Sequence, residues 1–206
     1  MNGQCIKCGN YEWDKIVDGT TVKCPKCGHT WEQVSLPLFV LSGCSGVGKT
    51  TTAQMIQQKK VDFVVLDADV FCGYMKSETN EDFESRLNLI EQLSMNIMQS
   101  GRPVLWTMAG NLDKLHHQYC RRFFPDIKVL ALTCEEELLR KRMKEGRGIT
   151  DENWIEGSVD YNEYFKTHDR HGDTVFETFD ISGKTVEEVA EYVIDWVKEN
   201  CLEESD

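Results

Sequence analysis

The chain has 206 residues, a formal net charge of −12 and 40% hydrophobic residues, which suits one globular domain with a small appendage. It contains neither an apolar run of roughly 18–20 residues, as a membrane span needs, nor the apolar core of a signal peptide at its N-terminus, so we expect a cytoplasmic protein with no membrane partner. The acidic balance and the lack of a long Lys/Arg block make nucleic acid an unlikely partner.

The first 34 residues carry a metal-binding pattern. Two C-x2-C pairs, separated by 15 residues, contain Cys5, Cys8, Cys24 and Cys27. Each pair aims two sulfurs at one point, and together they can surround one zinc ion tetrahedrally. Glycine follows each pair, at Gly9 and Gly28, where a tight turn needs a left-handed backbone. The segment resembles a zinc ribbon, and because so short a unit buries little core, bound Zn²⁺ would supply most of its folding energy. The alternative is four unrelated buried thiols.

The remaining residues, 35–206, alternate between short apolar segments and segments with helical spacing. The expected strands cover residues 36–42, 61–67, 103–107, 127–133 and 174–181, and the expected helices cover 49–60, 80–100, 135–146 and 185–200. Thr185, followed three residues later by Glu188, is typical of a helix N-cap with a capping box. Alternation of this kind predicts an α/β fold, a parallel sheet with helices on both faces.

A phosphate-binding loop follows the first of these strands. Residues 43–50 read GCSGVGKT, which matches the pattern G-x4-G-K-[ST] between a strand and a helix. Backbone N–H groups of such a loop surround the β-phosphate of a nucleotide, helped by the partial positive charge of the helix N-terminus. We expect the loop and the start of the helix to bind the cofactor through Gly43, Ser45, Gly46, Val47, Gly48, Lys49, Thr50 and Thr51. Lys49 would bridge the β- and γ-phosphates, and Thr50 would ligate Mg²⁺.

Two carboxylates follow the second strand, in the sequence LDADVF. Asp67 and Asp69 come where parallel strands end, which is where ligands bind in such sheets. The third strand, 103–107, ends without an acidic residue, so Asp67 is the better candidate for the Mg²⁺ ligand. Asp69 is then left to bind the substrate and accept a proton from an attacking hydroxyl. The alternative is a solvated loop that happens to carry two acids.

Two further segments are candidates for the active site. The turn MAGN, residues 108–111, has small residues that allow close approach of a substrate to the backbone, which makes Gly110 and Asn111 candidates for substrate binding, although a plain connecting loop is the alternative. Arg142 and Arg147 lie where a helix enters a polar, glycine-containing stretch. A mobile arginine can stabilise the charge of a transferring phosphoryl group, whereas a solvated helix face is the alternative.

Residues 36–200 resemble the small P-loop kinases, which include shikimate kinase, gluconate kinase, chloramphenicol phosphotransferase and the nucleoside monophosphate kinases. The resemblance rests on the P-loop, the D-x-D after the second strand, the R-M-x-x-x-R segment and the final DISGKTVEEVAEYVIDWV. It implies strand order 2-3-1-4-5, a lid near residues 146–168, Arg142 stacked on adenine and Asp69 at the acceptor hydroxyl. Arg86 is a candidate for a substrate-binding arginine. The zinc ribbon is not part of this family's usual pattern.

These observations predict an ATP- and Mg²⁺-dependent kinase that acts on a small molecule, with Lys49, Asp69 and Arg147 as its catalytic residues. A nucleoside monophosphate kinase is one alternative, although Asp69 would repel a phosphate-bearing acceptor. A nucleotide-switched binding module, with the ribbon contacting a protein partner, is the other.

Overall fold

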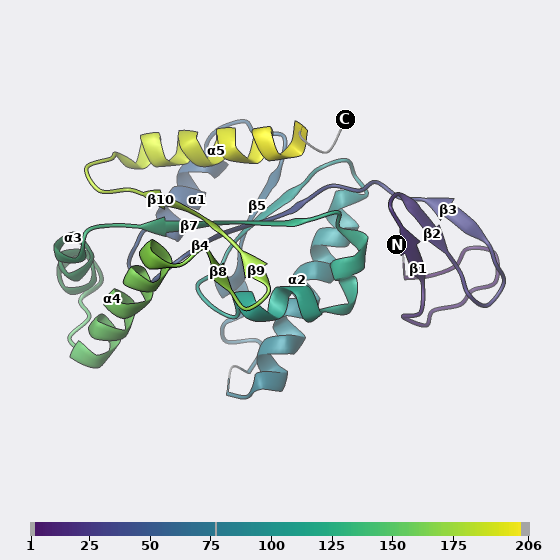
Figure 1. The fold of residues 1–206 in the computed structure, drawn as a ribbon, viewed down its shortest axis with the longest axis horizontal. Helices are drawn as coiled ribbons and strands as arrows, with labels where there is room; N and C mark the ends of the chain where they lie inside the picture. The colour runs from purple at the N-terminus through teal and green to yellow at the C-terminus, as the bar shows by residue number, and fades with distance from the viewer. Residues whose placement is uncertain (1–2, 77, 203–206) are drawn as a thin grey trace.

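The computed structural model describes residues 3–76 and 78–202. A small three-stranded ribbon lies at one end of the molecule and a larger α/β unit makes up the rest (Figure 1). Among the helices in these ranges, none has both the length and the apolar composition required to cross a membrane.

The larger unit is built on a five-stranded sheet. Its strands are β4 (Leu38–Gly43), β5 (Val64–Asp67), β6 (Val104–Thr107), β7 (Ile127–Thr133) and β10 (Glu177–Asp180). Every neighbouring pair is parallel, in the order β5-β6-β4-β7-β10. The strand labels run along the whole chain, so β1–β3 belong to the small ribbon, and β8 and β9 form a separate hairpin before β10. Counted along the chain within this sheet alone, the order is 2-3-1-4-5, so the predicted fold class is confirmed.

Helices cover both faces of this sheet. They are α1 (Lys49–Gln57), α2 (Asn80–Met98), α3 (Glu136–Lys141), α4 (Glu152–Thr167) and α5 (Val186–Leu202). The short 3₁₀ helices η1 (Ala68–Phe71), η2 (Leu112–His117) and η3 (Tyr119–Phe123), and a π-helical segment, η4 (Arg142–Gly146), lie between them. Figure 1 shows α1 and α5 on one side of the sheet and α2 on the other. The predicted capping box is present before α5, where the Glu188 amide donates to Thr185 Oγ1 and the Thr185 amide donates to the Glu188 carboxylate.

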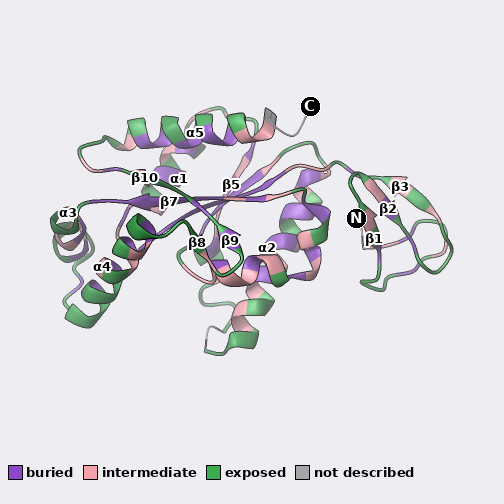
Figure 2. Ribbon diagram, in the orientation of Figure 1, coloured by how far each residue is buried: buried purple, intermediate pink, exposed green. Residues whose placement is uncertain are grey.

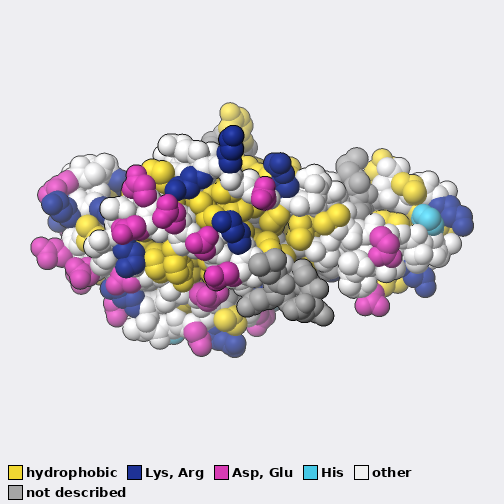
Figure 3. All heavy atoms as spheres, turned by 90° about the horizontal axis from the view of Figure 1, so that it is seen from above, with side chains coloured by type: hydrophobic (Ala, Val, Ile, Leu, Met, Phe, Trp, Pro, Cys, Tyr) yellow, Lys and Arg dark blue, Asp and Glu magenta, His cyan; other side chains and the backbone are white. Residues whose placement is uncertain are grey.

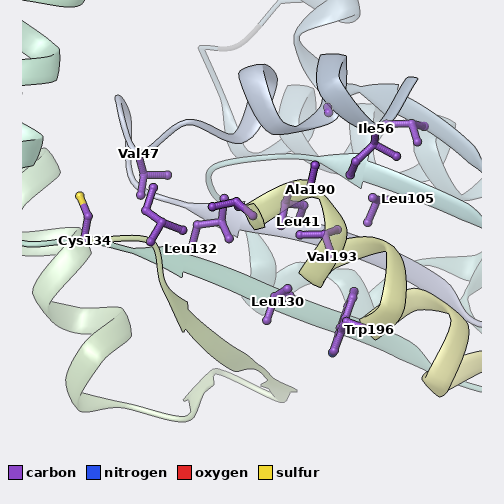
Figure 4. Packing of buried hydrophobic residues seen from close by; sticks show 14 of the residues in the cluster. Leu41, Val47, Ile56, Leu105, Leu130, Leu132, Cys134, Ala190, Val193 and Trp196 are labelled. Carbon is purple, nitrogen blue, oxygen red and sulfur yellow. The ribbon is translucent and has the colours of Figure 1, made fainter. Parts of the chain in front are cut away.

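Each face of the sheet has its own apolar cluster because side chains alternate along a strand. On one face Leu41, Leu130 and Leu132 pack against Ile56 of α1 and against Ala190, Val193 and Trp196 of α5 (Figure 4). On the other face Leu38 and Val40 pack with residues of α2. Buried residues follow the strands and the inner sides of the helices, whereas the outer side of α5 is exposed (Figure 2).

Two segments differ from the pattern expected from the sequence. Residues 174–181 do not form one strand: β9 (Thr174–Val175) pairs in a hairpin with β8 (Arg170–His171), and β10 begins after Phe176. Helix α4 was not predicted, because the residues that it buries are Ile155, Ser158, Asn162 and Phe165. Two of these four are polar, so the apolar period that normally indicates a helix is hidden.

The ribbon packs directly on the larger unit. Its antiparallel strands are β1 (Ile16–Asp18), β2 (Thr21–Lys23) and β3 (Thr30–Glu32). The Lys15 amide donates to Tyr119 Oη at 3.2 Å, and Gln99 exchanges two hydrogen bonds with the backbone of Val34. Val22 is fully buried in the same apolar cluster as Leu38. The two units therefore share part of one core.

Candidate active site

The loop between β4 and α1 requires glycine at specific positions. Gly43, Gly46 and Gly48 have φ values of 133°, 85° and 117°, a region that L side chains rarely adopt. A Cβ on Gly43 would lie 2.6 Å from the Leu132 carbonyl oxygen, and one on Gly46 would lie 2.7 Å from Cγ of Met143. The loop therefore depends on its glycines to pass close to β7 and η4.

Lys49 lies at the start of α1 and folds back over the loop. Its Nζ donates hydrogen bonds to the carbonyl oxygens of Gly43 and Cys44, at 2.8 and 2.9 Å. Burial lowers the pKa of Lys49, and the carboxylates of Asp67 and Asp69 oppose this shift. Helix α1 has no side-chain cap, so its first amide groups remain available to an anion. Loop, helix end and lysine together have the donors and the charge that an anion-binding site needs.

The two aspartates at the end of β5 and in η1 lie beside this loop. Oδ2 of Asp67 accepts a hydrogen bond from Thr50 Oγ1 at 3.0 Å, and its Oδ1 accepts one from the Asp69 amide at 3.0 Å. Both aspartates line the cleft above the loop. The oxygens of Thr50 and Asp67 are hard ligands brought together by the fold, which suits Mg²⁺.

Thr107 is the last residue of β6, the strand at whose end the sequence has no acidic residue. It is the register partner of Asp67 in the β5–β6 pair and lines the same cleft. Its hydroxyl is buried without a hydrogen-bond partner among the described residues. Thr107 was not predicted from the sequence, because the group expected at the end of this strand is a carboxylate.

Two arginines reach the loop from η4 and the turn that follows it. Arg142 donates to the Val47 carbonyl oxygen at 2.9 Å, and Arg147 donates to Ser45 Oγ. Both guanidinium groups belong to the cleft that contains Lys49. The structure therefore places three cations around the phosphate-binding loop.

The cleft has a volume of about 760 Å³ and contains most of the residues expected from the sequence. Its lining also includes Met108 and Ala109 of the predicted turn 108–111, together with residues that sequence analysis did not select singly: Thr52, Thr107, Gly146, Trp154, Ile181, Lys184, Val186 and Val189. Gly146 and Trp154 fall within the lid range 146–168 that the resemblance implies. Ile181, Lys184, Val186 and Val189 belong to the final segment DISGKTVEEVAEYVIDWV on which the resemblance partly rests, so the motif itself was the signal for them.

Three predicted substrate residues lie outside this lining. Gly110 and Asn111 follow the lining residues Met108 and Ala109, and Asn111 has a left-handed φ of 60° at the start of η2. Arg86 lies on α2, where it donates to the Lys76 carbonyl oxygen at 3.4 Å and its guanidinium carbon is 5.8 Å from the centre of the Phe83 ring. Their part in acceptor binding stays a prediction.

The four ribbon cysteines converge at the other end of the molecule. Their sulfur atoms all lie within 4.8 Å of one another, and the pairs Cys5–Cys27 and Cys8–Cys24 are each separated by 3.7 Å. In a tetrahedron with metal–sulfur bonds of 2.3 Å, sulfurs are about 3.8 Å apart. The cluster therefore has the size and donor set of a four-thiolate metal site.

The fold is shared with solved structures of low sequence identity. A sugar kinase from Janibacter sp. HTCC2649 matches with a TM-score of 0.59 and 19% identity over 79% of this chain and 95% of its own. A tunicamycin resistance protein from Deinococcus radiodurans matches with a TM-score of 0.57 and 15% identity, over 79% and 95% of the two chains. A gluconokinase from Sinorhizobium meliloti 1021 matches with a TM-score of 0.56 and 15% identity, over 84% and 97%.

A search of curated proteins finds no match. The model of a protein family described as AAA domain matches residues 40–166, which is more than half of the chain and includes the phosphate-binding loop, both aspartates and both arginines. The chain belongs to the AAA domain family, with a P-loop fold that it shares with small-molecule kinases.

Proposed function

We propose that this protein is a kinase that transfers the γ-phosphoryl group of ATP, with Mg²⁺, to a hydroxyl group of a small molecule. One observation carries the proposal: the fold brings Lys49, the Thr50–Asp67 pair and Asp69 into one cleft at the carboxyl edge of the sheet. Nucleotide-dependent phosphoryl transfer is the chemistry that uses such a set.

Each group has a distinct part in this reaction. The loop amides and Lys49 bind the phosphates, and Thr50 with Asp67 would hold Mg²⁺, which neutralises phosphate charge when bound. The Asp69 carboxylate accepts the proton of the acceptor hydroxyl. The hydroxyl oxygen bonds to the γ-phosphorus while the bond between that phosphorus and the β,γ-bridging oxygen breaks and ADP leaves. Arg147 stabilises the charge on the transferring group.

The charge distribution on one face of the molecule (Figure 3) favours a small molecule over nucleic acid as the acceptor. Acidic and basic side chains are interspersed over the face in Figure 3, which shows no extended basic patch. The sugar kinase and gluconokinase that share the fold make hydroxylated small molecules the first class to test.

The test is a screen for ADP release from ATP and Mg²⁺ with sugars, hydroxy acids, nucleosides and nucleotides as acceptors. Asp69→Asn and Lys49→Ala are assayed on every compound that stimulates release. A hydroxyl acceptor whose phosphorylation is lost in Asp69→Asn supports the proposal. A nucleoside monophosphate as the only acceptor, with Asp69→Asn still active, supports a nucleotide kinase. ATP binding with no transfer to any acceptor supports a nucleotide-controlled binding module.

We also propose that the four ribbon cysteines bind one Zn²⁺ and that the ribbon offers a surface for a protein partner. The sulfur separations match those of a tetrahedral thiolate site. Exposed apolar side chains, among them Ile6 and Tyr11, leave apolar surface on this unit. Elemental analysis of the purified protein tests the first statement, and one zinc per chain is the expected result.

A further inference from the structure

Trp154 is a large apolar side chain that the fold leaves exposed in the catalytic cleft. It is 49% exposed and lines the cleft with Lys49 and Asp69. Its backbone is fixed, since the Asp151 carboxylate caps α4 by accepting hydrogen bonds from the amides of Asn153 and Trp154. The next residue, Ile155, is fully buried. The indole is therefore held at the edge of the cleft by a well-anchored helix start.

The indole faces the guanidinium of Arg147. The guanidinium carbon of Arg147 lies 5.6 Å from the centre of the Trp154 ring, within the range of a cation–π interaction. The same guanidinium donates a hydrogen bond to Ser45 Oγ in the phosphate-binding loop. Arg147 thus bridges the loop and the indole. Gly146 and Gly148 flank it in the sequence, so the backbone alone constrains the arginine weakly.

Ion pairs fix the two elements on either side of Arg147. Arg140 of α3 makes a bidentate pair with Glu156 of α4, at 2.7 and 2.8 Å, and Lys144 of η4 pairs with Glu152 at 2.8 Å. Exposed pairs contribute little singly, but two that join the continuous segment of α3 and η4 to α4 restrict the relative motion of the two segments. The indole is consequently a stable support against which a flexible arginine can be placed.

We propose that Trp154 is a positioning residue that holds Arg147 over the phosphate-binding loop, where the terminal phosphate of the nucleotide binds. The inference rests on the proposed function, because it assigns Arg147 to the γ-phosphate. Trp154 touches the arginine and acts through it. Without the indole, Arg147 is still present, but its guanidinium is free to move away from the phosphate-binding loop.

The experiment is a double-mutant cycle measured by calorimetry with a nonhydrolysable ATP analogue and, separately, with ADP, both with Mg²⁺. The variants are Trp154→Leu, Arg147→Ala and the double variant, with Trp154→Phe to keep an aromatic ring. We expect Trp154→Leu to weaken binding of the triphosphate by about 5-fold, the size of a partly desolvated cation–π contact, with ADP affinity unchanged. Trp154→Phe should retain most of the affinity, and the double variant should be no weaker than Arg147→Ala.

One variant outside the cleft serves as the control. Arg102→Ala removes an exposed arginine before β6. It should bind either nucleotide like the original protein. In the original protein the triphosphate should also change tryptophan fluorescence, and Trp154→Phe should remove that change, because Trp154 is the one tryptophan among the described residues that line the cleft.

The outcomes separate this inference from the proposed function. Additive losses in the double variant, or equal losses for ADP and the triphosphate, would show that Trp154 does not act through Arg147 at the terminal phosphate, and would overturn the inference. The double-mutant cycle measures nucleotide binding without any acceptor, so its result does not depend on phosphoryl transfer. Failure of the original protein to phosphorylate any compound in the acceptor screen would overturn the proposed function alone.

Discussion

Glu91 offers a sharp test of the electrostatics of the core. This residue of α2 is fully buried, and both carboxylate oxygens lack a hydrogen-bond partner among the described residues. Burial raises the pKa of Glu91 from 4.5 to about 8, and the nearby cation Arg121 only partly opposes this shift. The proposed change is Glu91→Gln, which keeps the shape of the side chain and removes its titration.

The magnitude follows from the difference between the folded and unfolded pKa values. Between pH 4.5 and about 8 the folded state retains a proton that the unfolded chain has lost, so the free energy of unfolding falls as the pH rises through this window. Each pKa unit corresponds to about 1.4 kcal/mol, so the ionisable group costs about 4 kcal/mol near pH 8 and about 1 kcal/mol or less near pH 5. Glu91→Gln should therefore be more stable than the original protein at alkaline pH and nearly equal to it at acidic pH.

The assay is urea unfolding of both proteins at several pH values between about 5 and 8.5. The difference in unfolding free energy between the two proteins cancels groups that titrate identically in both, including the histidines. It should grow by about 4 kcal/mol from the acidic to the alkaline end. Parallel pH profiles would refute the reasoning, because they would mean that the buried carboxyl does not keep its proton. Glu91→Met, which also removes the unpaired polar atoms, should be at least as stable as Glu91→Gln at every pH.

The remaining predictions concern the cleft and the cysteine cluster of the ribbon. Lys49→Ala should lower phosphoryl transfer by about 10²–10³-fold, because a cation is lost where charge develops, as measured by ADP release. Asp69→Asn should reduce transfer to the acceptor by about 10²–10⁴-fold yet spare slow hydrolysis by water, whereas Asp67→Asn should weaken both and raise the Mg²⁺ requirement; equal losses in both assays would contradict this division. Cys24→Ser should abolish bound zinc, measured by elemental analysis, and leave ATP affinity within about 2-fold, because the apolar cluster beside the phosphate-binding loop contains no described residue of the ribbon.

Sequence patterns predicted the parts of the fold that depend on local chemistry. The loop glycines are constrained by close contacts with Leu132 and Met143, and a motif with glycine at fixed places already encodes that requirement. The apolar strands and the capping box at Thr185 are equally local. Helix α4 could not be predicted in this way, because Asn162 is buried through hydrogen bonds to the backbone of Cys134, a partner 28 residues away.

The candidate site shows the same division between local and distant determinants. Lys49 and Thr50 follow from one motif, whereas Thr107 is recognised only when the sheet register places it beside Asp67. Trp154 was likewise not predicted individually as a cleft residue, because its contact with Arg147 is known only from the structure. Residues placed by strand pairing or by a ring contact do not recur at a fixed spacing in the sequence, so no motif identifies them.

The position of the ribbon limits what it can contribute to catalysis. Strand β4 runs from Leu38, at the ribbon side of the chain, to the phosphate-binding loop at Gly43, so the two lie at opposite ends of this strand, about 17 Å apart at 3.3 Å per residue. In Figure 1 the ribbon and helices α3 and α4 accordingly lie at opposite ends of the molecule. None of the described ribbon residues lines the cleft. A partner bound to the ribbon would therefore leave the cleft open, and any effect on catalysis would have to pass through the shared core around Val22 and Leu38.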